Sequence, residues 1–140
     1  MTEPQWTHII LHHSLTEDGP TVSWQAIRRY HVETLGWNDV GYHFGLEWVN
    51  REYEIFMGRP LDQTGAHTIG MNDKAIGICC VGNYDVQYPT EALISKLVPL
   101  VRVLCRIFSI SKDHIAGHRD YAPKSCPGKN FDLDMIRSRL

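Results

Sequence analysis

The order of the apolar segments predicts an α/β fold: a single domain over residues 1–140, with a central mixed β-sheet flanked by helices. Three observations indicate this fold. Short apolar runs typical of strands alternate along the chain with segments whose apolar residues recur at helical spacing. Residues 76–81 are apolar without alternation, as in a strand that is covered on both faces. Two further runs are spaced as a hairpin, and their antiparallel pairing would make the sheet mixed.

Four segments of the first half of the chain carry signals of regular structure. The first is a short apolar run typical of a buried strand. The second has apolar residues at helical spacing, with Ser23 as its N-cap and Gly36 at its end. The last two flank Arg51 and Glu52 and are expected to form the hairpin, although this pair is not a turn that hairpins favour. The segments are residues 8–12, 23–35, 42–50 and 53–57.

The second half of the chain is expected to hold two strands and two helices. Residues 76–81 form the central strand, and residues 114–117 form a short one. Thr90 is the N-cap of the longest helix, and Pro99 lies within its apolar stripe, so this helix should kink or divide there. Asp132 is the N-cap of the final helix.

Composition and charge exclude several classes of partner. With 14 basic against 16 acidic residues and no basic stripe, the chain is not expected to bind nucleic acid. No apolar stretch is long enough to span a bilayer, and the first six residues lack the basic region of a secretory signal. We therefore expect a protein that is synthesised in a cytoplasm and does not insert into membranes. We also expect it to be a monomer.

Histidine and cysteine residues near strand ends predict a metal site. His12 and His13 end the first strand, His118 follows a later strand, and Cys126 lies in a polar segment. A catalytic zinc takes three protein ligands from histidine, cysteine and carboxylate groups and keeps one position open. One of the two adjacent histidines, with His118 and Cys126, supplies such a set. Only one of the pair can reach the metal, because neighbouring residues of a strand point to opposite faces.

The other three cysteines are expected to be small apolar residues of the core. Cys79 and Cys80 lie in the central apolar run, and Cys105 lies among the apolar residues of the longest helix. Unpaired cysteine is among the most buried residue types. Cys126 differs because prolines flank its polar segment. In a reducing compartment a metal or catalytic role is favoured for it over a disulfide.

Several stretches carry a resemblance to a known family. They are IILHHS at residues 9–14, GWNDVGYHF at 36–44, GAH at 65–67, IGI at 76–78, GHRD at 117–120 and PKSCPG at 123–128. In this order they resemble the zinc-dependent N-acetylmuramoyl-L-alanine amidases, a family that includes phage amidase lysozymes and the peptidoglycan recognition proteins. The resemblance covers nearly the whole chain.

The resemblance implies a reaction and a ligand set. The reaction is hydrolysis of the amide bond between N-acetylmuramic acid and L-alanine in bacterial peptidoglycan, with peptidoglycan or a muropeptide as substrate and one zinc ion per chain. The first histidine of the pair, His12, would be a zinc ligand together with His118 and Cys126. His13 would point away from the metal.

The resemblance also implies roles for three other residues. Tyr42 and Lys124 would be catalytic, because each can donate a hydrogen bond to the oxyanion formed when the amide is attacked. His67 would contact substrate in the cleft. One departure concerns Cys79, which stands where some relatives have a glutamate on the central strand. An obvious general base is therefore missing, and the zinc-bound water, Tyr42 or Lys124 would have to handle the proton.

Several alternatives remain open. A phage or prophage endolysin, reaching the wall through a membrane lesion, and a cytoplasmic amidase that recycles muropeptides would share this site. The chain could instead be a non-catalytic peptidoglycan-binding module, although the resemblance implies that such members lose the cysteine ligand, and Cys126 is present. A lysozyme that also binds a polymerase is a further possibility. A closed structural zinc site would need a fourth ligand, for which His114 is the nearby candidate.

Overall fold

The computed structural model describes residues 3–15 and 23–140 and contains a mixed sheet of five strands in the order β3-β2-β4-β1-β5. Strands β2, β4, β1 and β5 are parallel, and β3 pairs with β2 in the antiparallel sense. The predicted α/β class and mixed sheet are therefore confirmed. The first six residues are those expected not to form a secretory signal. Two of them, Met1 and Thr2, lie outside the described residues. The strands are β1 His8–His13, β2 Phe44–Val49, β3 Glu52–Met57, β4 Ala75–Cys80 and β5 Ile115–Gly117.

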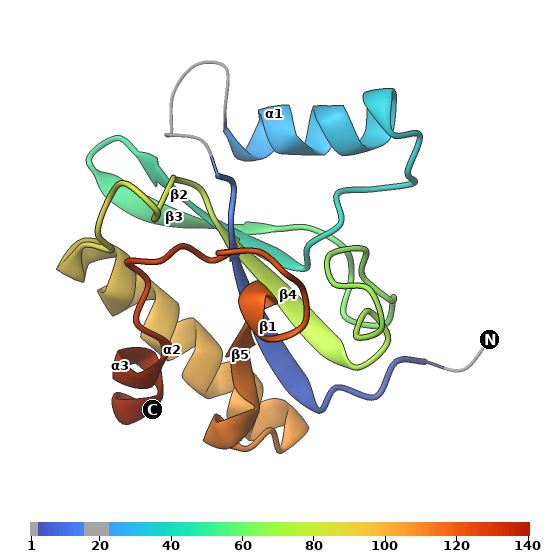
Figure 1. Ribbon diagram of the computed structural model, residues 1–140. Coiled ribbons are helices and arrows are strands. Elements are labelled where there is room, and N and C mark those ends of the chain that lie inside the picture. Colours follow the sequence, from blue (N-terminus) through green and yellow to red (C-terminus); the bar gives the residue numbers. More distant parts are fainter. Residues whose placement is uncertain (1–2, 16–22) are drawn as a thin grey trace.

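Helices lie on both faces of the sheet (Figure 1). The long helix α2 (Glu91–Phe108) and the C-terminal helix α3 (Leu133–Ser138) lie on one face, and α1 (Trp24–Arg29) lies on the other. The main core is between the sheet and α2, where Ile9 and Leu11 of β1 pack with the apolar stripe of α2. None of the helices in the described part of the chain is long and apolar enough to cross a bilayer.

Alternation along β1 divides its side chains between the two faces. Ile9 and Leu11 belong to the core beneath α2, whereas Ile10 belongs to a separate small cluster on the opposite face. His12 follows the same alternation and therefore projects from the face opposite α2. In the register of the parallel pair β1–β4, His12 stands beside Cys79. This face is the one on which the functional site is built.

The three predicted helix N-caps are confirmed. The side-chain oxygens of Ser23, Thr90 and Asp132 accept hydrogen bonds from backbone amides in the first turns of α1, α2 and α3, at 3.1, 3.2 and 3.2 Å. The first helix changes character after Arg29, because Tyr30–Thr34 form a π-helical turn, η1, before the chain leaves it at Gly36 with a positive φ of 74°. Helix α2 runs through Pro99 as one element, so it does not divide there; the alternative, a kink at Pro99, stays a prediction.

The hairpin turn lies one residue earlier than predicted. Val49 pairs with Glu52, so the two turn residues are Asn50 and Arg51 rather than Arg51 and Glu52. Their φ angles of 51° and 68° are both positive, as a two-residue type I′ turn requires. Asparagine tolerates this conformation well, which explains why the turn uses Asn50. The short strand β5 likewise begins at Ile115 and not at His114.

The predicted burial of the cysteines is confirmed for the two on β4. Cys79 and Cys80 are fully buried, on opposite faces of the sheet. Cys105, on α2, is only partly buried and packs at the edge of the main core. The cysteines of β4 are therefore packing residues, as their apolar surroundings predict.

Candidate metal centre

Two parallel neighbouring strands bring the first two histidines of the site together. Leu11 of β1 pairs with Gly117 of β5, so His12 and His118 stand beside each other where these strands end. His118 opens the short 3-10 helix η3 (His118–Asp120). The centroids of the two imidazole rings are 4.7 Å apart. Because the strands are parallel, both side chains reach the same edge of the sheet.

Cys126 comes to the histidines from a loop. Its Sγ lies 3.7 Å from Nδ1 of His12 and accepts a hydrogen bond of 3.4 Å from the backbone amide of His13. The Cys126 carbonyl accepts a 2.7 Å bond from the amide of Arg119, which ties the loop to η3. The loop is also fastened by Asp85, whose carboxylate accepts hydrogen bonds from the Ser125 hydroxyl and from the Lys129 amide.

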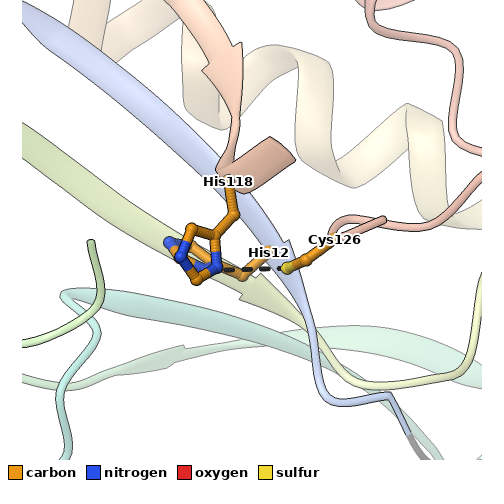
Figure 2. Close-up of side chains that lie close together, drawn as sticks. All are labelled: His12, His118 and Cys126. Atoms are coloured by element: carbon orange, nitrogen blue, oxygen red, sulfur yellow. Dashed lines mark hydrogen bonds between the residues drawn. The ribbon is translucent and has the colours of Figure 1, made fainter. Parts of the chain in front are cut away.

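The three side chains converge from β1, η3 and this loop (Figure 2). The ligand atoms of His12, His118 and Cys126 all lie within 4.8 Å of one another. Tetrahedral coordination with normal zinc–sulfur and zinc–nitrogen bonds places sulfur and nitrogen ligands about 3.5 Å apart. The observed 3.7 Å between His12 and Cys126 matches that spacing, so this donor set fits a zinc ion.

Burial sets the protonation of the three groups. The pKa of His12 is well below its usual value, first because the ring is buried and then because His67 and His118 are near. Burial also lowers the pKa of His118, with Lys124 adding to the effect. Burial raises the pKa of the Cys126 thiol to about 11, against the opposing effects of the His13 amide and Lys124. Both imidazoles are therefore neutral donors, and the thiol must lose its proton when a metal binds.

His13 and His114 do not join this cluster. Nδ1 of His13 accepts a 3.1 Å hydrogen bond from the Tyr84 amide. His114, exposed just before β5, donates from Nδ1 to the Thr7 carbonyl and stacks on His8. Over residues 3–15 and 23–140, the cluster contains only His12, His118 and Cys126. A site with three protein ligands leaves a coordination position open, as a catalytic zinc requires.

The cluster lies in the wall of a cavity of about 530 Å³, which also contains the three other residues predicted to act in the site. Leu15, His31 and Trp37 widen the cavity; spacing along the sequence did not predict them, because they meet the cluster only through the fold. The residues lining the cavity are His12, His13, Leu15, His31, Trp37, Tyr42, Ala66, His67, His118, Lys124, Ser125 and Cys126.

Tyr42 is placed as a hydrogen-bond donor beside the cluster. The centroid of its ring is 5.1 Å from that of His12. Burial raises the pKa of its hydroxyl well above the usual value, and the thiols of Cys79 and Cys126 raise it further, with a hydrogen bond between Tyr42 and Cys79. The hydroxyl therefore keeps its proton at neutral pH. The pKa of Cys79 is also raised, chiefly by burial, so this thiol is neutral and is not a base.

His67 lines the cavity, but both of its ring nitrogens are occupied by protein atoms. Nδ1 lies 2.9 Å from Nε2 of His12, and Nε2 lies 3.0 Å from the carbonyl oxygen of Ala75. Burial lowers the pKa of His67 to about 3, so the ring is neutral. Thr68, which the sequence did not single out, places its hydroxyl 3.3 Å from Nε2 of His12. The predicted contact of His67 with substrate stays a prediction.

Comparison with known proteins places this chain in a family. The family model described as "N-acetylmuramoyl-L-alanine amidase" matches residues 2–129. The chain is 35% identical over 130 residues to the endolysin of Enterobacteria phage K11, covering 91% of this chain and 82% of that protein. It is 34% identical over 116 residues to a human N-acetylmuramoyl-L-alanine amidase, covering 81% of this chain but only 19% of that much longer protein.

A solved structure has the same architecture. The N-acetylmuramoyl-L-alanine amidase LysC from Clostridium intestinale URNW superposes with a TM-score of 0.86 at 30% sequence identity. The match covers 97% of this chain and 85% of that one. Residues 2–129, which the family model matches, include β1, β5 and the loop that carries Cys126.

Proposed function

The chain belongs to the N-acetylmuramoyl-L-alanine amidase family, and on that basis we propose how it acts: it hydrolyses the amide bond between N-acetylmuramic acid and L-alanine in peptidoglycan, using one zinc ion held by His12, His118 and Cys126. The observation that carries the proposal is the convergence of these three ligands in the wall of a cavity that also contains Tyr42 and Lys124. The presence of Cys126 supports an enzyme rather than a module that only binds the wall.

The residues of the cavity suit attack on an amide carbonyl. When bound, zinc lowers the pKa of a coordinated water to about 7 and polarises the carbonyl. Tyr42, which keeps its proton, donates a hydrogen bond to the oxyanion that develops on the substrate, and the Lys124 ammonium group stabilises the same charge. Cys79 stays protonated and takes no part in proton transfer.

The biological setting that we propose is lysis of a bacterial host. Endolysins of phages K11, KP32 and T3 resemble the chain over 89 to 91% of its length, and it covers 81 to 82% of each of them. A protein of this kind would be synthesised in the host cytoplasm and would act on the wall after release. It would act as a monomer, because the cavity and the proposed ligand set are formed within one chain.

Metal analysis of two neighbouring variants tests the proposed ligand set. His12→Ala should remove zinc and abolish cleavage of a soluble muropeptide, because one of three ligands is lost. His13→Ala should keep about one zinc per chain, since its side chain bonds to the Tyr84 amide and its backbone amide still reaches Cys126. If His13→Ala loses the zinc while His12→Ala retains it, the assignment within the pair is wrong.

A further inference from the structure

The hydrogen bonds around His67 determine which nitrogen of His12 carries the proton. A carbonyl oxygen can only accept, so Nε2 of His67, 3.0 Å from the Ala75 carbonyl, must be the protonated nitrogen. In the neutral ring Nδ1 is then an acceptor. Its neighbour at 2.9 Å, Nε2 of His12, must therefore donate. The lone pair of His12 consequently lies on Nδ1, the nitrogen that faces Cys126.

We propose that His67 is a positioning residue that fixes the tautomer and orientation of His12, so that Nδ1 of His12 faces the metal. The Ala75 carbonyl, His67 and His12 form a hydrogen-bonded chain that ends at the ligand set. The proposal rests on the proposed function, since it assumes that His12 binds zinc. It assigns His67 a role different from the substrate contact expected from the sequence.

The surroundings of His67 hold its ring in place. A Cβ atom added to Gly77 would lie 2.6 Å from Cδ2 of His67, and one added to Gly65 would lie at the same distance from that atom. Both glycines are therefore needed for the ring to reach its position. The side-chain oxygen of Asn72 accepts hydrogen bonds from the backbone amides of His67 and Thr68, at 2.8 and 2.9 Å. The loop is thus fixed independently of any substrate.

Thr68 completes the set of acceptors around His12. Its hydroxyl oxygen is 3.3 Å from Nε2 of His12 and 2.9 Å from Nδ1 of His67. The residue is only 2% exposed. A substrate that bonded to a ring nitrogen of His67 would have to displace His12 or Thr68 at Nδ1, or the Ala75 carbonyl at Nε2. The structure therefore favours an action of His67 through His12 over direct contact with the substrate.

Zinc affinity of the full chain tests the proposal without relying on activity. Loss of a hydrogen-bond partner of a metal ligand typically weakens metal binding by roughly 10- to 100-fold. His67→Ala should raise the zinc dissociation constant, measured by competition with a chromophoric chelator, by about that factor. His67→Asn should recover most of the affinity, because its side-chain oxygen can accept in place of Nδ1. His114→Ala, an exposed histidine outside the cavity, is the matched control and should bind zinc as the wild type does.

The visible spectrum of the protein loaded with Co²⁺ gives a second measurement. The ligand-field bands should change in His67→Ala, because His12 is no longer held, and should return in His67→Asn. If circular dichroism shows that His67→Ala does not fold, His67→Phe takes its place, because it keeps a ring in the space and removes the acceptor.

Two results would overturn the proposal. If wild type binds zinc and the variants without the acceptor bind it equally tightly, with only a raised KM for a soluble muropeptide, His67 contacts substrate and does not position His12. In that case the proposed function stands. If the wild-type chain itself binds no zinc, the proposed metal centre fails, and the role of His67 fails with it.

Discussion

At the scale of single residues, two hydrogen-bond donors, Tyr42 and Lys124, line the cavity without belonging to the proposed set of metal ligands. Tyr42 stands 84 residues before Cys126 in the sequence. Its ring nevertheless lies near that of His12, and its hydroxyl keeps its proton. Lys124 comes from the exposed surface of the loop itself. Neither belongs to the cluster of His12, His118 and Cys126. Their contributions should therefore appear in turnover and not in zinc content.

The first prediction follows from this separation. Tyr42→Phe and Lys124→Ala should each retain one zinc per chain and a native fold. Removal of one oxyanion donor typically lowers turnover by about 10²–10³-fold. The loss should appear in kcat with little change in KM, because the interaction is made only in the transition state. Steady-state kinetics on a soluble muropeptide, with zinc measured on the same samples, provides the check. An unchanged kcat in Lys124→Ala would remove this residue from the mechanism.

Part of the residue-scale site follows from sequence, and part does not. His12, His118 and Cys126 could be selected because their residue types are zinc ligands and two of them stand at strand ends. The hydrogen bond from His12 to His67 could not be predicted, because it depends on a loop that packs against the glycine at position 77. Spacing along the chain contains no signal for such a contact.

At the scale of elements, the loop that carries Cys126 is held from outside by Asp85. Its carboxylate accepts 2.8 and 2.9 Å hydrogen bonds from the Ser125 hydroxyl and the Lys129 amide. These bonds lower the pKa of Asp85, and the bond from the Lys129 amide has the largest effect. The loop, between η3 and α3, contains no helix or strand, so such side-chain contacts fix its path. Its placement could not be derived from apolar periodicity, which did predict the strands, or from residue type, which did predict the helix caps.

The second prediction concerns this anchor. Asp85→Ala should accelerate hydrogen exchange of the Lys129 amide and weaken zinc binding, because the loop loses two bonds. The folded-state pKa of Asp85 is lowered, so its contribution is present above the unfolded pKa and is lost as pH falls through the folded value. The difference between wild type and Asp85→Ala should therefore shrink in acid. Asp113→Ala, on the exposed η2 turn (Lys112–His114), is the control. Equal exchange of the Lys129 amide in wild type and Asp85→Ala would show that the anchor has no effect.

At the scale of the whole molecule, buried neutral histidines link stability to pH. His43 is 1% exposed; its Nδ1 accepts a 3.1 Å bond from the Gly77 amide, and its Nε2 donates to the Gln63 carbonyl at 2.9 Å. Burial lowers its pKa from the usual 6.5. Protonation would remove the acceptor that the Gly77 amide needs. The folded state therefore binds fewer protons than the unfolded chain below pH 6.5.

The third prediction gives the sign of this effect. The free energy of unfolding of the metal-free protein should be highest above about pH 6.5. It should fall as the pH decreases towards the pKa values that the buried histidines have in the folded state. Each such histidine contributes a slope of up to about 1.4 kcal/mol per pH unit. Urea unfolding at several pH values between pH 8 and pH 5 measures this slope. His43→Leu should be less stable at pH 8 but should show a shallower slope, and an equal slope in both proteins would contradict the role of His43.

The overall fold could be predicted from the sequence more completely than its local details. Apolar runs and caps determine the α/β class, because a buried strand or an amphipathic helix has a recognisable period. The shift of the hairpin turn to Asn50 and the π-helical turn at Tyr30–Thr34 were missed. Both depend on backbone conformations that neighbouring elements impose, and composition does not report them.

The proposed reaction cleaves the bond between the sugar strand and the stem peptide. Mass spectrometry of purified peptidoglycan after digestion by the zinc-loaded protein identifies the bond that is cut. We predict release of stem peptides with a free amino group on L-alanine, together with glycan strands that keep N-acetylmuramic acid intact; His12→Ala should release neither. New reducing sugar ends, cleavage inside the stem peptide, or no release by the zinc-loaded wild-type protein would show that the chain does not have the proposed amidase activity.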